Sequence, residues 1–129
     1  MVVLPPQVAD ALIADARSQL PNEACGLLAL RHGELTDFTP SRNAEPSPYY
    51  YRIAPEDALR VIEIEDAGEQ VVIYHSHTTS PAAPSRTDVE LAKSWPDALY
   101  VIVSLASDPP EITAWTLAPA VQRVELTRA

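Results

Sequence analysis

Residues 71–88 of the chain read VVIYHSHTTSPAAPSRTD. The run over residues 71–74 is apolar and rich in β-branched side chains, which is typical of a strand buried on both faces. His75 and His77 follow at the end of this run. Because side chains two apart in a strand share a face, both imidazoles can converge on one point. Histidine is the commonest metal ligand, so the pair predicts a metal site, with two ordinary polar residues at a strand end as the alternative.

The same stretch ends in Ser-Arg-Thr-Asp, residues 85–88, after a loop that holds two prolines. Ser-x-x-Asp is close to a capping box, which predicts Ser85 as the N-cap of a helix over residues 85–95 and Asp88 at its third position. The helix dipole keeps a first-turn carboxylate ionised, as a metal ligand must be. We therefore expect one oxygen of Asp88 to serve the cap and the other to remain free for a metal.

Outward from this stretch, helical and strand patterns alternate. Apolar residues recur every four positions from Val8, and Gly68 ends a second helical pattern whose apolar face is Ala58, Leu59 and Ile62. The patterns predict helices over residues 5–21, 55–67 and 85–95, a turn at 31–33, and strands over 25–30, 34–38, 49–53, 71–74, 99–105, 112–117 and 121–126. This order indicates an α/β fold with a mixed sheet, in a single domain spanning residues 1–129.

Charge and cysteine content exclude several classes of protein. The formal net charge is -9, from 18 acidic and 9 basic residues, and this argues against binding to nucleic acid or to an anionic membrane. Cys25 is the only cysteine, so no intramolecular disulfide can form and a reducing compartment is indicated. The N-terminus lacks a signal-peptide pattern, and no apolar run is long enough to cross a bilayer. We expect a cytoplasmic protein.

Two further residues suggest chemistry at the start of the first predicted strand. Glu23 lies where the first helix gives way to this strand, and a solvated loop charge is its simplest interpretation. Cys25 suggests the nucleophile of a Cys–His hydrolase, against the alternative of a small buried core residue.

The pattern His-x-His-x7-Ser-x-x-Asp at residues 75–88, with a glutamate upstream at position 23, resembles the JAMM motif of the MPN domain family. The resemblance covers nearly the whole chain. It implies an MPN-like (cytidine-deaminase-like) mixed sheet that is partly barrel-like and flanked by about three helices. Many members carry proline directly after the second histidine, whereas this chain has Thr78.

The resemblance also implies a set of roles at the site. His75, His77 and Asp88 would bind one catalytic Zn²⁺, with a water as the fourth ligand. Glu23 would accept the proton of that water and pass it to the leaving amine. Ser85 would donate a hydrogen bond to the tetrahedral oxyanion.

Among family members, the chain resembles the compact bacterial enzymes that act on ubiquitin-like sulfur carriers. This implies a peptidase that hydrolyses the amide bond after the C-terminal glycine of a β-grasp carrier ending in Gly-Gly, releasing cysteine for cysteine biosynthesis. We expect the carrier tail to add as a strand beside the motif strand. Neither nucleic acid nor a membrane is expected as a partner, whereas a second copy of this chain is a candidate partner, in a homodimer.

Three other functions remain open from the sequence. One is a deconjugating isopeptidase for another ubiquitin-like protein. A second is a non-catalytic MPN interaction module holding a structural zinc, for which Cys25 would be the fourth ligand that closed sites need. A third is a metal-dependent phosphoesterase, since His-x-His also occurs there, although no glycine-rich anion loop accompanies it.

Overall fold

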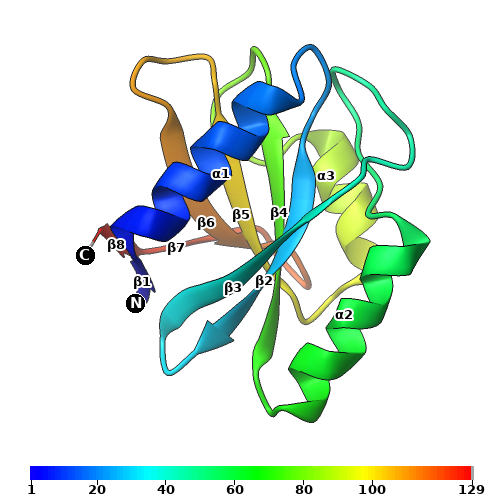
Figure 1. The fold of residues 1–129 in the computed structure, drawn as a ribbon, viewed down its shortest axis with the longest axis vertical. Helices are drawn as coiled ribbons and strands as arrows, with labels where there is room; N and C mark the ends of the chain where they lie inside the picture. The colour runs from blue at the N-terminus through cyan, green and yellow to red at the C-terminus, as the bar shows by residue number, and fades with distance from the viewer. Residues whose placement is uncertain (129) are drawn as a thin grey trace.

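The computed structural model describes residues 1–128 and shows three helices around one mixed, barrel-like sheet (Figure 1). The order of elements is β1 (Val2–Leu4), α1 (Pro6–Ser18), β2 (Cys25–Arg31), β3 (Glu34–Ser41), α2 (Pro55–Asp66), β4 (Gln70–His77), α3 (Arg86–Leu91), the 3₁₀ turn η1 (Ala92–Ser94), β5 (Leu99–Ser104), β6 (Glu111–Thr116), β7 (Gln122–Val124) and β8 (Leu126–Arg128). Within the described residues, no helix is long and apolar enough to cross a membrane.

The strands lie in the order β7-β6-β5-β4-β2-β3-β1-β8. β4, which carries both motif histidines, is central: it pairs antiparallel with β2 and parallel with β5. Both of its edges are therefore paired over residues 72–75, up to the first motif histidine. The expectation that a carrier tail adds as a strand beside the motif strand is wrong, because in the described residues β2 and β5 already occupy the two edges of β4 along that length.

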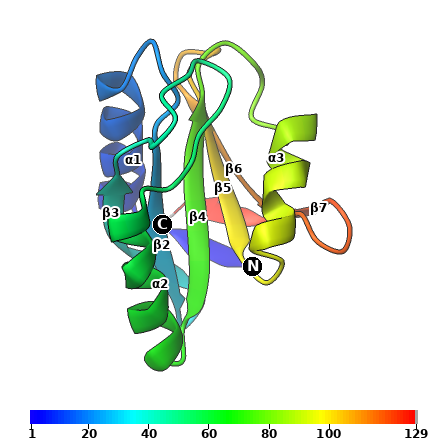
Figure 2. The ribbon, with the colours of Figure 1, turned by 90° about the vertical axis from the view of Figure 1, so that its right-hand side faces the viewer.

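Apolar side chains form a core on each face of the sheet. On one face, α1 packs against a cluster that includes Leu12 and Tyr74. On the other, α2 and η1 cover a second cluster that includes Ile64 and Ile73. In Figure 2, α2 lies to the left of β4 and α3 to its right. Because side chains alternate along a strand, His75 and His77 project from the same face of β4 as Ile73, toward α2 and α3.

Two local predictions are confirmed. The predicted turn at residues 31–33 connects β2 and β3, with His32 and Gly33 at φ 51° and 77°, as a tight hairpin requires. α2 ends just before Gly68, which adopts φ 74° at the position where a left-handed residue closes a helix.

Two predicted strands differ from the structure. Residues 49–53 form no regular strand; an isolated bridge between Asn43 and Ile53 is the pairing found there. The reason is local, because backbone groups of this segment bond to a side chain rather than to a neighbouring strand. The strand expected at 121–126 is divided into β7 and β8, which lie at opposite ends of the strand order. β1 was not predicted, since three residues give too short a pattern.

The predicted apolar face of the second helix is wrong. α2 buries Val61 and Ile64, whereas Leu59 and Ile62 are 64% and 56% exposed. Apolar residues occur on more than one side of this helix, so spacing alone could not decide which side meets the sheet. The first helix is also shorter than predicted, and Leu20 lies beyond its end and is exposed.

Candidate active site

The register of the sheet brings Glu23 to the motif. β2 begins at Cys25, which pairs with His75, so the residues just before β2 lie beside the end of β4. Two bonds extend this pairing: the Ala24 N–H donates to Ser76 Oγ (2.8 Å), and the Ser76 N–H donates to the Ala24 carbonyl (3.0 Å). Gly26 allows β3 to lie close, because a Cβ there would be 2.7 Å from the Thr39 carbonyl oxygen.

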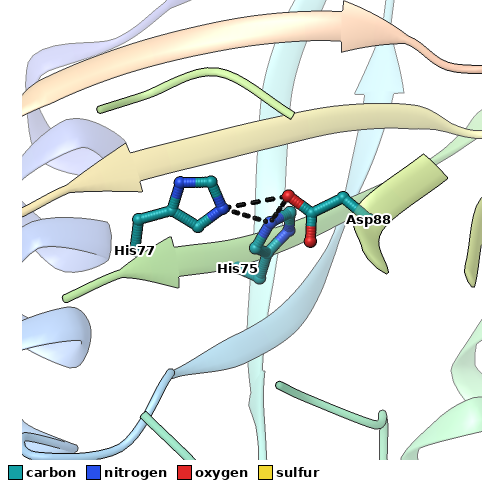
Figure 3. Close-up of side chains that lie close together, drawn as sticks. All are labelled: His75, His77 and Asp88. Atoms are coloured by element: carbon teal, nitrogen blue, oxygen red, sulfur yellow. Dashed lines mark hydrogen bonds and ion pairs between the residues drawn. The ribbon is translucent and has the colours of Figure 1, made fainter. Parts of the chain in front are cut away.

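Three side chains converge at the C-terminal end of β4 (Figure 3). His75 Nε2 and His77 Nε2 lie 3.3 Å apart, and Asp88 Oδ2 is 3.1 Å from the first and 2.9 Å from the second. All three residues are buried. The structure thus brings together the three residues that the motif predicts as metal ligands.

The donor set fits a zinc ion. Imidazole nitrogens and a carboxylate oxygen bind Zn²⁺ at ~2.0–2.2 Å, and a tetrahedron of that size separates its donor atoms by roughly 3.3 Å. The observed separations of 2.9 to 3.3 Å are close to this value. Two imidazoles with one carboxylate suit zinc better than harder cations, which prefer oxygen ligands alone.

Each imidazole is held by a different neighbour. His77 Nδ1 lies 2.7 Å from the Pro81 carbonyl oxygen, so Nδ1 carries the proton and Nε2 is left free as a ligand. His75 stacks on Tyr51, with ring centroids 4.5 Å apart and planes at 12°. The His75 Nδ1 atom is buried and has no hydrogen-bond partner in the described part of the chain. Burial would lower the pKa of His77, but the bonds to Asp88 and Pro81 raise it overall.

The predicted capping box is confirmed. Ser85 is the N-cap of α3: its Oγ accepts from the Asp88 N–H (3.0 Å), and its own N–H donates to Asp88 Oδ2 (2.9 Å). The expectation that one oxygen of Asp88 serves the cap and the other faces the metal is wrong. Oδ2 both accepts the bond from the Ser85 N–H and faces the imidazoles. Burial would raise the pKa of Asp88. The His75 charge and hydrogen bonds from His75, His77 and the Ser85 N–H instead lower this pKa well below its usual range.

Glu23 is not a solvated loop charge. The residue is 4% exposed, and its Oε1 has no hydrogen-bond partner among the residues that the structure describes. Burial raises the pKa of Glu23 to about 8; the His77 charge opposes this increase and the Asp88 charge adds to it. Glu23 lines a cavity of about 210 Å³ together with His77 and Ser85. An unpaired carboxyl beside the three converging donors is suited to accept a proton there.

Cys25 takes no part in the donor cluster. Its Sγ contacts backbone carbonyl oxygens at 3.9 to 4.0 Å, and burial raises the pKa of this thiol to about 12. A thiolate nucleophile is therefore disfavoured. Among the described residues, the group of converging metal ligands consists of His75, His77 and Asp88. Three protein ligands leave a coordination position open, unlike the four of a closed structural site.

No pattern in the sequence predicts the stacking between Tyr51 and His75. The aromatic and β-branched residues at 49–53 predict a strand instead. The contact joins residues 24 positions apart through a loop, and no spacing rule describes such a loop.

Comparison with known proteins agrees with this geometry. Residues 5–118 match the family described as prokaryotic homologs of the JAB domain. The chain belongs to this family. It is thus a member of the JAMM/JAB peptidases, as the motif at residues 75–88 predicts.

Named relatives cover most of the chain. A CysO-cysteine peptidase of Mycobacterium tuberculosis is 47% identical over 108 residues, covering 81% of this chain and 73% of the relative. A desampylase of Haloferax volcanii is 38% identical over 104 residues, covering 74% of each protein. The solution structure of a Desulfitobacterium hafniense protein superposes with a TM-score of 0.84 at 29% identity, covering 100% of this chain and 93% of that one.

Proposed function

We propose that this JAMM peptidase is zinc-dependent and hydrolyses the amide bond after the C-terminal glycine of a ubiquitin-like carrier protein. One observation carries the proposal: three donor atoms of His75, His77 and Asp88 lie within 3.3 Å of one another, and the unpaired carboxyl of Glu23 lines the adjoining cavity. An open metal position beside a proton acceptor is what amide hydrolysis requires.

The residues divide the reaction among them. Zinc held by His75, His77 and Asp88 would supply a Lewis acid that lowers the pKa of a water and polarises the scissile carbonyl. Glu23 takes a proton from the attacking water, whose oxygen bonds to the carbonyl carbon. Glu23 then gives this proton to the amine nitrogen as the C–N bond breaks. Ser85 keeps its O–H free to donate to the oxyanion, because its oxygen only accepts in the helix cap.

The substrate we propose is a sulfur carrier ending in Gly-Gly, with cysteine as the released amino acid. The name of the mycobacterial relative supports this choice. Because β2 and β5 occupy the edges of β4 over residues 72–75, we propose that the carrier tail lies over the face of the sheet. A second cavity of about 380 Å³ offers that path, since its wall includes Tyr51, which stacks on His75. Its remaining lining is Arg52, Ile53, Ile73, Leu91, Ser94 and Trp95.

We further propose that residues 1–129 act as one catalytic domain in the cytoplasm. A second candidate activity is removal of a ubiquitin-like protein from a lysine side chain, which the desampylase relative favours. The two activities differ in the leaving group: a free amino acid in the first, and a protein-bound amine in the second.

The deciding experiment compares two adducts of one β-grasp carrier, with cysteine or with a lysine side chain joined to its terminal glycine. Mass spectrometry of the zinc-loaded protein's products should show carrier ending in glycine and free cysteine, formed faster than the lysine product. A chelator should stop the reaction and added zinc restore it. Faster cleavage of the lysine adduct would overturn the cysteine-release proposal in favour of the isopeptidase. Cleavage of neither adduct would overturn both.

A further inference from the structure

Asn43 is buried in the loop that leads from β3 to α2, and its side-chain amide uses its full hydrogen-bonding capacity. Nδ2 donates to the carbonyl oxygens of Glu23 (3.1 Å) and Tyr50 (3.0 Å). Oδ1 accepts from the N–H groups of Glu45 and Arg52, both at 3.0 Å. The residue is 6% exposed. A buried amide that makes all four hydrogen bonds holds the backbone groups that it contacts in place. Removing the amide would leave several of these polar groups without partners in surroundings of low dielectric, which is costly.

The first pair of these bonds bears on the proton acceptor. The backbone of Glu23 is held at both ends: its N–H donates to the Ser47 carbonyl (2.8 Å), and its carbonyl accepts from Asn43. The carboxyl of Glu23, in contrast, has a buried oxygen, Oε1, that no group within residues 1–128 hydrogen-bonds. Its position above the cavity therefore depends on its backbone and not on side-chain hydrogen bonds to its own oxygen.

The second pair bears on a metal ligand. Asn43 bonds to the carbonyl of Tyr50 and to the N–H of Arg52, and so it holds the chain on both sides of Tyr51. The Tyr51 ring lies flat against His75. Within the described residues, His75 has no hydrogen bond at Nδ1, the ring nitrogen that faces away from the donor cluster. Apart from Asp88 and His77 at Nε2, the stacked Tyr51 ring is therefore the contact that sets this ring plane, where His77 has the Pro81 carbonyl for the same purpose.

We propose that Asn43 is a positioning residue whose single amide sets both the proton acceptor Glu23 and, through Tyr51, the metal ligand His75. This inference rests on the proposed function for the role of Glu23. The part that concerns His75 can be tested without any substrate, because zinc affinity can be measured on the protein alone.

Zinc affinity tests the path through Tyr51. The dissociation constant is measured by competition with a chromogenic chelator. Asn43→Ala and Tyr51→Ala should each weaken zinc binding by about tenfold, the scale on which groups that orient metal ligands act. Tyr51→Phe keeps the ring and should bind zinc as the native chain does. The double variant should bind no more weakly than Tyr51→Ala alone, because Asn43 acts on His75 through that ring.

Turnover tests the hold on Glu23. Asn43→Asp has nearly the same shape and keeps the two accepted bonds, among them the one from Arg52, but it cannot donate to the carbonyls of Glu23 and Tyr50. Its kcat should fall about tenfold with KM little changed, whereas its loss of zinc affinity should be smaller than that of Asn43→Ala. Asn22→Ala serves as the matched control, since Asn22 adjoins Glu23 but its side chain makes none of these bonds. It should match the native chain in both measurements.

Native zinc affinity in a folded Asn43→Ala protein, or additive losses in the double variant, would overturn the path to His75. Native kcat in Asn43→Asp would overturn the hold on Glu23. If Asn43→Ala does not fold, Tyr51→Leu against Tyr51→Phe still decides whether the ring supports the metal ligand, and Asn43→Asp decides the rest. Failure of the native chain to cleave any carrier would reject the proposed function and leave the zinc result standing.

Discussion

The two sides of the site are built in different ways. On the motif side, residues 75–88, two histidines share a face of β4 and an aspartate enters from the first turn of α3, so local geometry sets the positions. On the loop side, Glu23 and residues 43–53, position depends on bonds between residues far apart in the chain, such as that from Asn43 to Glu23.

The proposed roles are also divided between the two sides. The motif side carries the three proposed metal ligands, without which no zinc would be held. The loop side carries the proposed proton acceptor Glu23 and the Tyr51 ring that stacks on His75. We therefore expect substitution of a motif-side metal ligand to abolish zinc binding, whereas substitution of Ser85 or of a loop-side residue should change the rate or the affinity while zinc can still bind.

The largest effect should come from removing a motif ligand. His77→Ala leaves two of the three donors, so zinc binding and peptidase activity should both fall below detection. Metal analysis after dialysis gives the zinc content. His32→Asn is the matched control, because His32 is exposed in the β2–β3 turn and asparagine tolerates its positive φ. Loss of activity with one zinc retained would contradict the assignment of His77 as a ligand.

The next largest effect should come from the proton acceptor on the loop side. Glu23→Gln keeps the shape of the side chain but cannot take a proton, so kcat should fall by about 10²- to 10⁴-fold. The zinc content should remain one per chain. Glu90→Gln, on the exposed surface of α3, should leave kcat unchanged. Native turnover in the Glu23 variant would remove this residue as the base.

Ser85 belongs to the motif side but should affect rate, not metal content. Ser85→Gly keeps most of the capping energy and removes the hydroxyl, so kcat should fall by about 10²- to 10³-fold with a nearly native melting temperature. Ser85→Thr retains the hydroxyl and should restore activity. If the glycine variant turned over at the native rate, the cap would be the whole role of Ser85.

The smallest effect concerns stability without metal. The pKa of Glu23 is raised from 4.5 to about 8, chiefly by burial, so its protonated form is favoured in the folded state. Its stabilising contribution is present below pH 4.5 and is lost as the pH rises to about 8. Urea unfolding in a chelator should thus show Glu23→Gln gaining stability relative to the native chain over this interval. A difference that does not vary with pH would show that Glu23 has an ordinary pKa.

The sequence predicted the motif side better than the loop side for a physical reason. Strand alternation and the helix cap act within a few residues, so the spacing of His75, His77 and Asp88 was enough to predict their convergence. Asn43 bonds to one residue two positions away and to three others 7, 9 and 20 positions away, and no periodicity predicts the three longer-range bonds. The segment at 49–53 was assigned to a strand for its composition, although its bonds go to a side chain.

For the fold too, features set by neighbouring residues are easier to predict than features set by residues far apart in the chain. The β2–β3 hairpin and the cap of α3 depend on turn and capping residues, and both were predicted. The buried face of α2 depends on which side meets the sheet, and Leu59 was placed wrongly for that reason. The central place of β4 in the sheet depends on pairing between distant strands, so the expected docking beside it could be rejected only from the structure.

X-ray absorption at the zinc edge of the zinc-loaded protein reports the ligand set of the metal. We expect one zinc per chain with nitrogen and oxygen ligands at ~2.0–2.1 Å, two of them imidazoles, and no sulfur ligand. His77→Ala should lose this signal. A sulfur neighbour at ~2.3 Å would place Cys25 in the coordination sphere, and it would contradict an open catalytic site formed by His75, His77 and Asp88.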